Sequence, residues 1–119
     1  MQRRSLIALA ALACAAVTAH AQAPDWKKIR IGVEGAYPPF SEVDKDGKLK
    51  GFEIEYAQAL CAEMKAECTL VQQDFDGLIP ALQARKVDAI IASMSITEER
   101  KQRVAFTNKY YQTPARFVA

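Results

Sequence analysis

Histidine is almost missing from this chain. Its 119 residues include one, His20, close to the amino terminus. A single imidazole excludes a zinc site built from several histidines, and removal of residues 1–21 after export would leave the chain with none. We therefore expect no metal, no cofactor and no catalytic scheme that depends on an imidazole, and we predict a protein that is not an enzyme.

Residues 1–21 have the pattern of a secretory signal peptide. Two arginines give a positive start, an apolar run rich in Ala and Leu fills residues 5–18, and Ala19-His20-Ala21 fits the small-x-small rule for signal peptidase. The apolar run is short and rich in Ala for a membrane span. We predict cleavage after Ala21 and a location in the periplasm.

An excess of charge of either sign is also missing once the signal is removed. Of 16 Lys and Arg, two (Arg3 and Arg4) leave with it, so 14 basic residues face 14 Asp and Glu. The remaining net charge is 14 − 14 = 0, which argues against a basic patch for nucleic acid or for a membrane surface. We expect a monomer that binds a small molecule.

Cysteine is scarce, with three in the chain. Cys14 lies in the signal and suggests the alternative of a lipoprotein, but Ala11 stands where a lipoprotein signal has Leu. Cys61 and Cys68 remain, and export to an oxidising compartment favours a disulfide between them over the alternative of two reduced thiols. A closed loop of eight residues would contribute about 2.5 kcal/mol to stability.

The first half of the remaining chain predicts a strand, a hairpin and a helix. Ile29–Val33 alternates apolar and other residues and is rich in β-branched types, as strands are. Asp46-Gly47 is a strong turn signal between the short segments 41–43 and 49–52. Apolar residues then recur every three or four positions, which predicts one buried helix stripe: Ile54, Ala57, Leu60, Cys61 and Met64.

The second half predicts two more strands, each followed by a helix. Cys68–Val71 reads as a short strand, and Asp76 can cap the helix that follows it. Asp88–Ala92 reads as a buried strand, and Thr97 opens a helix that extends to Arg103. Alternation of strands and helices indicates the α/β class, with a parallel sheet covered on both faces.

Polar and aromatic residues follow each of the three predicted strands. They are Glu34 and Tyr37 after the first, Phe75 after the second, and Ser93, Ser95 and Arg100 after the third. Ligands of open parallel sheets bind beyond the carboxyl ends of the strands, so these residues form one candidate site. Arg100 can bind a carboxylate, Tyr37 and Phe75 can stack on both sides of a ligand, and Glu34 can pair with a ligand cation.

Each of these residues also has a purely structural interpretation. Arg100 can pair with Glu98 or Glu99 on a solvated helix face. The two aromatic residues can fill the edge of the core, and Glu34 can be an ordinary exposed carboxylate. The spacing of these residues does not decide between the two interpretations.

At this point the sequence resembles the bacterial periplasmic solute-binding proteins of polar amino-acid ABC transporters, and within them the lysine/arginine/ornithine- and histidine-binding group. The stretches that carry the resemblance are residues 29–40, Gly51-Phe52-Glu53-Ile54, Leu78-Ile79-Pro80-Ala81-Leu82 and residues 88–100. The spacing of Cys61 and Cys68 matches the disulfide of that group.

The resemblance implies a two-lobed periplasmic binding protein of type II with its ligand between the lobes. Residues 29–119 would form most of lobe one after a lead-in over residues 22–28, and the second lobe is absent. Arg100 takes the place of the carboxylate clamp, Ser93 and Ser95 of hydrogen-bonding residues, and Glu34 of an acid in members that bind basic ligands. Ala92 departs from the pattern, because close relatives have a third serine there.

The function that follows is periplasmic binding of a polar, cationic amino acid and its delivery to an ABC transporter permease in the inner membrane. Two alternatives stay open: an enzyme that shares the fold, such as a dehydratase or the front module of a lytic transglycosylase, or the sensor module of a receptor. With one lobe alone, we expect ligand binding at millimolar concentration at best, about −4 kcal/mol.

Overall fold

The computed structural model describes residues 26–118, which form two small sheets and three helices; the predicted signal peptide lies outside this range. The main sheet is parallel, in the order β5-β1-β6. Its strands are β1 (Lys28–Val33), β5 (Glu67–Gln72) and β6 (Ala89–Ile90). The predicted parallel sheet is therefore present, although β6 is shorter than the segment 88–92 that we expected.

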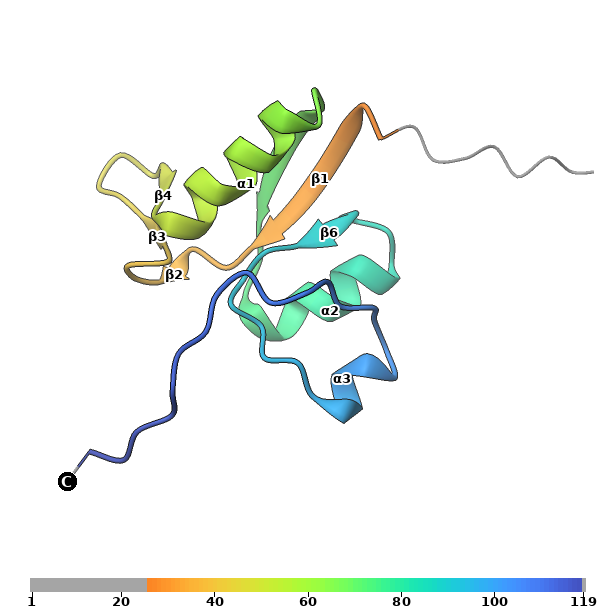
Figure 1. Ribbon diagram of the computed structural model, residues 1–119. Coiled ribbons are helices and arrows are strands. Elements are labelled where there is room, and N and C mark those ends of the chain that lie inside the picture. Colours follow the sequence, from red (N-terminus) through yellow and green to blue (C-terminus); the bar gives the residue numbers. More distant parts are fainter. Residues whose placement is uncertain (1–25, 119) are drawn as a thin grey trace, which may run out of the picture.

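Successive residues of β1 point to opposite faces of the sheet, and a different helix covers each face. Ile29, Ile31 and Val33 are buried on the face of α1 (Phe52–Glu63). Gly32 points the other way, because a Cβ on it would lie 3.0 Å from Leu78 of α2 (Phe75–Gln83). Figure 1 shows these helices on opposite sides of the sheet. Successive strand residues point to opposite faces, so this one strand supports both layers.

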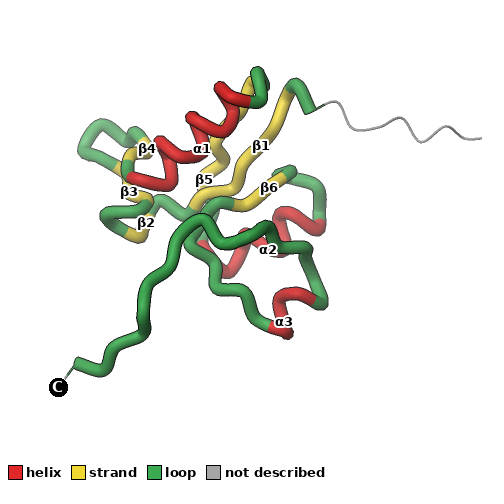
Figure 2. The backbone as a smooth tube through the Cα atoms, viewed as in Figure 1, coloured by secondary structure: helices red, strands yellow, loops and turns green. Residues whose placement is uncertain are grey.

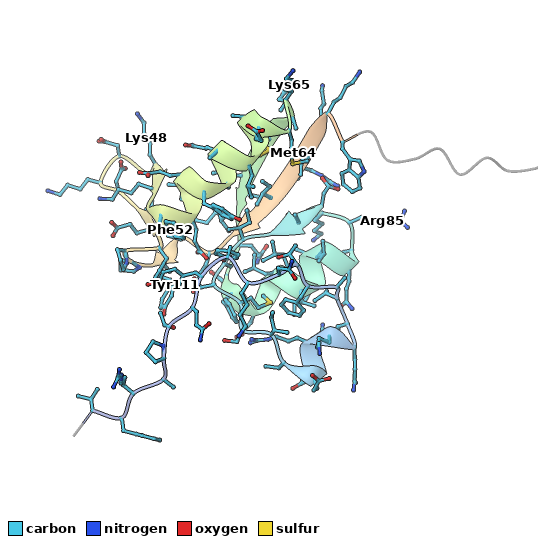
Figure 3. The ribbon with its side chains drawn as sticks, in the orientation of Figure 1. Lys48, Phe52, Met64, Lys65, Arg85 and Tyr111 are labelled. Carbon is cyan, nitrogen blue, oxygen red and sulfur yellow. A yellow bond between two sulfur atoms is a disulfide. The ribbon has the colours of Figure 1, made fainter. Side chains whose placement is uncertain are left out.

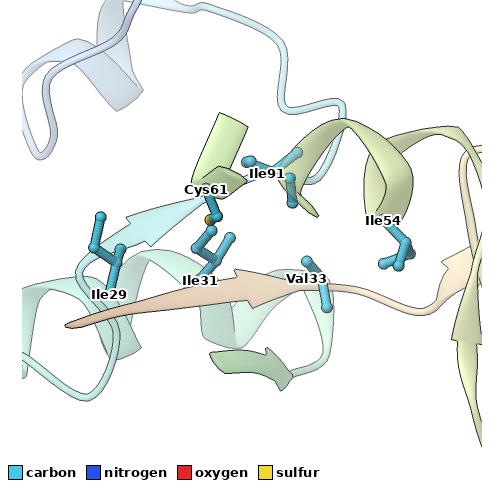
Figure 4. Close-up of a cluster of buried hydrophobic side chains, with 7 residues drawn as sticks. Ile29, Ile31, Val33, Ile54, Cys61 and Ile91 are labelled. Carbon is cyan, nitrogen blue, oxygen red and sulfur yellow. The ribbon is translucent and has the colours of Figure 1, made fainter. Parts of the chain in front are cut away.

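Helix α1 buries a slightly different stripe from the predicted one. Ile54, Ala57 and Cys61 pack with the isoleucines of β1, as expected, and Figure 4 shows this core. Leu60 and Met64 are instead exposed. The buried stripe begins one residue earlier than the apolar pattern indicated, with a carboxylate residue described below.

The predicted hairpin is confirmed and has an additional strand. β3 (Ser41–Val43) pairs with β4 (Leu49–Lys50), and β2 (Ala36–Tyr37) extends the sheet on the other side of β3. The Asp44 carboxylate accepts hydrogen bonds from the N–H groups of Asp46 and Lys48 at 2.8 and 2.9 Å. These bonds close the turn, so the hairpin has a fixed register.

The second and third helices begin at other residues than the sequence indicated. α2 starts at Phe75 with Asp74 in the N-cap position, so the prediction of Asp76 as the cap was wrong. Asp76 lies inside the first turn, where a negative charge also favours the helix dipole. α3 (Glu98–Lys101) is shorter than predicted, and the Thr97 hydroxyl accepts the Arg100 N–H at its start, as expected.

Across residues 26–118, none of the three helices combines the length and hydrophobicity that a membrane span requires. The disulfide that the sequence favoured is present. Cys61, near the end of α1, is joined to Cys68 of β5, with 6.1 Å between their Cα atoms. The bond ties the helix to the sheet beside the core.

We expect reduction of this disulfide to lower the free energy of unfolding by about 2.5 kcal/mol, the entropic value of a loop of this length. Urea unfolding of the exported chain with and without reductant measures the difference. Mass spectrometry before reduction should find both thiols blocked, and two free thiols in freshly isolated periplasmic protein would contradict the prediction.

At the amino end of the sheet, Arg30 and Asp88 join β1 to the segment that enters β6. The Arg30 guanidinium donates to both carboxylate oxygens of Asp88, at 2.8 and 3.0 Å, and the Arg30 backbone N–H donates to the same group at 2.9 Å. The side-chain hydrogen bonds from Arg30, followed by its backbone N–H, hold the pKa of Asp88 below its ordinary value. The ionised carboxylate therefore stabilises the fold.

We expect Asp88→Asn to destabilise the chain at neutral pH and to make stability less dependent on pH. A carboxyl group with a lowered pKa contributes fully above its unfolded pKa of about 3.9, and the contribution is lost as pH falls through the folded pKa. Thermal unfolding between pH 7 and pH 3 should show the wild type and the variant converging at low pH. Glu98→Gln, which breaks the exposed pair with Lys101, is the control and should change stability little.

Candidate functional site

The polar residues predicted from the strand ends do lie at the carboxyl edge of the main sheet. Glu34 directly follows β1, Phe75 opens α2 after β5, and the loop with Ser93 and Ser95 follows β6. Figure 2 shows this connection from β6 to α3 as a loop. The parallel arrangement of the strands brings the three segments to one end of the sheet.

Two neighbouring cavities divide the candidate residues between them. Tyr37, Ser93 and Ser95 line a cavity of about 350 Å³, and Phe75 and Arg100 line one of about 200 Å³. Met94 lines both, so the two cavities lie side by side. Glu34 is half-buried one residue beyond β1 and lines neither of them.

Arg100 is held by its own loop and by an aromatic ring. Its guanidinium carbon lies 5.3 Å from the centre of the Phe75 ring, and Nη1 donates to the Ser95 carbonyl oxygen at 3.0 Å. The ion pairs among the described residues include none between Arg100 and Glu98 or Glu99, and the Glu98 carboxylate binds Lys101 at 2.8 Å instead. Since a guanidinium has five N–H donors, one protein hydrogen bond leaves most of its fork for a planar anion.

The two candidate aromatic residues each have a partner within the chain. Tyr37 stacks on Phe40 with 5.2 Å between ring centres and 17° between planes, while Phe75 lies against Arg100. Tyr37 is 47% exposed, so its ring retains a free surface. The two rings therefore border different cavities, and each ring packs against another residue of the chain on one side.

Sequence reasoning missed the most enclosed polar residue of the site, Glu53 on α1, whose exposure is 0%. Its Oε1 accepts three hydrogen bonds: from the Ser93 N–H at 2.5 Å, the Ser93 hydroxyl at 2.8 Å and the Tyr110 hydroxyl at 2.5 Å. Ser93 has φ = 47°, a left-handed conformation that costs a residue with a Cβ about 1–3 kcal/mol. The carboxylate thus fixes a strained residue at the edge of the main cavity.

A signal for Glu53 is present in the sequence. It lies four residues before Ala57 and eight before Cys61, on the same helix stripe that buries those residues. A carboxylate on a buried stripe needs hydrogen-bond donors from elsewhere in the fold, which makes it a candidate for a specific role. The donors come from residues 40 and 57 positions away, and periodicity alone does not identify them.

Tyr110 connects the last part of the chain to this carboxylate. Burial raises the pKa of its phenol well above the ordinary value, and the hydrogen bond to Glu53 raises it further. The ring stacks on Tyr56 of α1 at 5.1 Å, and Tyr111 lies 5.8 Å from Phe52. Figure 3 shows Phe52 and Tyr111 close together where the chain leaves the body of the molecule.

The arrangement suits recognition of a small polar molecule. Arg100 offers N–H donors for an anion, Ser93 and Ser95 offer hydroxyl groups, and two aromatic rings border the space. Within the part of the chain that the structure describes, no cluster of three His, Cys, Asp or Glu could hold a metal ion.

Comparison with known proteins finds relatives that bind basic amino acids. The L-arginine-binding protein of Pseudomonas aeruginosa is 56% identical over 115 residues, 97% of this chain and 44% of that protein. The lysine/arginine/ornithine-binding periplasmic protein of Escherichia coli is 41% identical over 117 residues, 98% of this chain and 45% of that protein. This chain therefore spans less than half the length of either relative.

A solved structure with the same fold is the arginine-bound form of domain 1 from TmArgBP. It has a TM-score of 0.68 and 40% identity, and the match covers 71% of this chain and 68% of that domain. Residues 29–119 match the family described as bacterial extracellular solute-binding proteins, family 3. The match confirms the resemblance seen in the sequence, and the chain belongs to this family of solute-binding proteins.

Proposed function

We propose that this chain is the ligand-binding lobe of a periplasmic protein that binds a cationic amino acid, such as arginine, for delivery to an ABC transporter. The observation that carries the proposal is the guanidinium of Arg100. It lies against Phe75 at the edge of the sheet, donates to the Ser95 carbonyl oxygen, and has most of its donors unused by the protein.

Each candidate residue has a distinct role in this proposal. Arg100 binds the α-carboxylate that all amino acids share. Ser93 and Ser95 hydrogen-bond the polar groups next to it, and Tyr37 and Phe75 provide aromatic surface. Glu34 recognises the positive charge of the ligand side chain, and attraction to a carboxylate and to ring faces favours a cationic ligand over a neutral one.

The names of the relatives support this ligand class. They bind L-arginine, or lysine, arginine and ornithine. Domain 1 of TmArgBP has a solved structure in an arginine-bound form. That finding supports arginine binding by residues 22–119, while millimolar affinity at best stays our prediction for the single lobe.

The relatives are solute-binding proteins, which favours binding without chemistry over the alternatives of an enzyme or a receptor module. We infer that the full-length protein, meaning the exported product with both lobes, closes around its ligand as a monomer and docks on a permease in the inner membrane. Cleavage after Ala21 would release it into the periplasm.

Arg100→Ala should weaken binding of every amino-acid ligand by about 3 kcal/mol, because it leaves a buried carboxylate without its partner. Calorimetric titration of the full-length protein with arginine, lysine, ornithine and glutamine measures the loss. Lys101→Ala is the matched control, since this neighbouring cation already pairs with Glu98. Equal affinities of the Arg100 variant and the wild type would exclude Arg100 as the carboxylate clamp.

Glu34→Gln should weaken arginine, lysine and ornithine by about 1 kcal/mol and leave glutamine unchanged, because it removes charge while keeping shape. The same titrations test it, with Glu42→Gln as a control for loss of an acid that pairs with Lys50 in the hairpin. A variant that loses glutamine and arginine affinity equally would show that Glu34 does not read side-chain charge. The ligand class would then be polar amino acids in general.

A further inference from the structure

Glu53 uses only one of its two carboxylate oxygens. Oε1 accepts all three hydrogen bonds, whereas Oε2 is fully buried and has no partner among the described residues. The donors come from two segments outside α1: the loop after β6, through Ser93, and the last part of the chain, through Tyr110. The carboxylate therefore joins three parts of the fold at one atom.

The contacts with Glu53 use both polar hydrogens of Ser93. The backbone N–H points to Oε1 and also lies 2.9 Å from the Tyr110 oxygen, and the hydroxyl hydrogen is donated to Oε1. A serine hydroxyl has one hydrogen and two lone pairs. Once the hydrogen is given to Glu53, the Ser93 oxygen can only accept a hydrogen bond from a ligand.

We propose that Glu53 is a positioning residue that fixes Ser93 as an acceptor for the α-ammonium group of the ligand. This inference rests on the proposed function, amino-acid binding, and assigns an orientation within the site. The carboxylate of the ligand lies at Arg100, where donors are free, and its ammonium lies at Ser93, where acceptors are free. The left-handed backbone of Ser93 depends on the same contacts.

Two substitutions separate positioning from charge. Glu53→Gln retains a side-chain oxygen for the three donors and can place its amide nitrogen where the unpartnered Oε2 now lies. We expect it to keep arginine affinity within about twofold of the wild type, because the acceptor is preserved. Glu53→Met has similar length and no comparable acceptor, and should weaken arginine binding about tenfold, the value of one hydrogen bond.

The assigned orientation is tested with an arginine analogue that lacks the α-amino group, 5-guanidinopentanoic acid. Glu53→Met should lower its affinity much less than that of arginine, because the analogue makes no contact that depends on Ser93 as an acceptor. A general disturbance of the lobe would weaken both ligands alike. Glu55→Met, at an exposed acid on the same helix, is the matched control and should leave both affinities unchanged.

All titrations use the full-length protein by calorimetry, with circular dichroism to establish that each variant is folded. Equal losses for arginine and the analogue in Glu53→Met, or a tenfold loss of arginine in a folded Glu53→Gln variant, would overturn the inference. If the Met variant does not fold, the Gln variant decides alone. A wild-type protein that binds no cationic amino acid would overturn the proposed function itself, and that result is obtained before any variant is made.

Discussion

β1 lies between β5 and β6 and presents one face to α1 and the other to α2, so this one strand joins both neighbouring strands and both covering helices. Ile29, Ile31 and Val33 form the floor under α1, while the missing side chain of Gly32 lets Leu78 of α2 approach. Parallel pairing on both sides then aligns three carboxyl ends at one edge. The site lies at that edge because each parallel strand ends there and is followed by a loop that can carry binding residues.

The buried carboxylate of Glu53 holds the loop after β6 in place at that edge. A loop after a two-residue strand has few backbone bonds of its own, and the strained Ser93 would be costly without support. Three hydrogen bonds to one oxygen supply that support and attach the loop to the rigid helix α1. Burial strengthens such bonds, and it also makes the loss of an acceptor more damaging than at the surface.

Aromatic contacts extend the same connection to the end of the described chain. Tyr110 stacks on Tyr56, and Tyr111 contacts Phe40 and Phe52. Beyond these residues the chain leads away from the sheet, and Phe117 and Val118 are almost fully exposed. Tyr110, which donates to the Glu53 carboxylate, is therefore next to Tyr111 among the last described residues that pack on the lobe.

The sequence by itself determined the class of fold and the location of the site. Local patterns were enough to predict a parallel sheet, because each lies within a short stretch of the chain. They are the alternation in Ile29–Val33, the apolar helix stripe and the order of strands and helices. Residues after the strands could be placed at one edge for the same reason. Thr97 was recognised as the residue that opens a helix, and a disulfide between Cys61 and Cys68 was favoured because export leads to an oxidising compartment.

Only the tertiary structure decided which of these residues share a cavity and what supports them. Arg100 contacts the Phe75 ring and the Ser95 carbonyl oxygen and not its acidic neighbours. Tyr37 and Phe75 border different cavities. Glu53 could be placed on the buried stripe from its spacing, but its partners are 40 and 57 residues away. Hydrogen bonds over such separations depend on how the layers pack, and a pattern read along the chain does not contain that information.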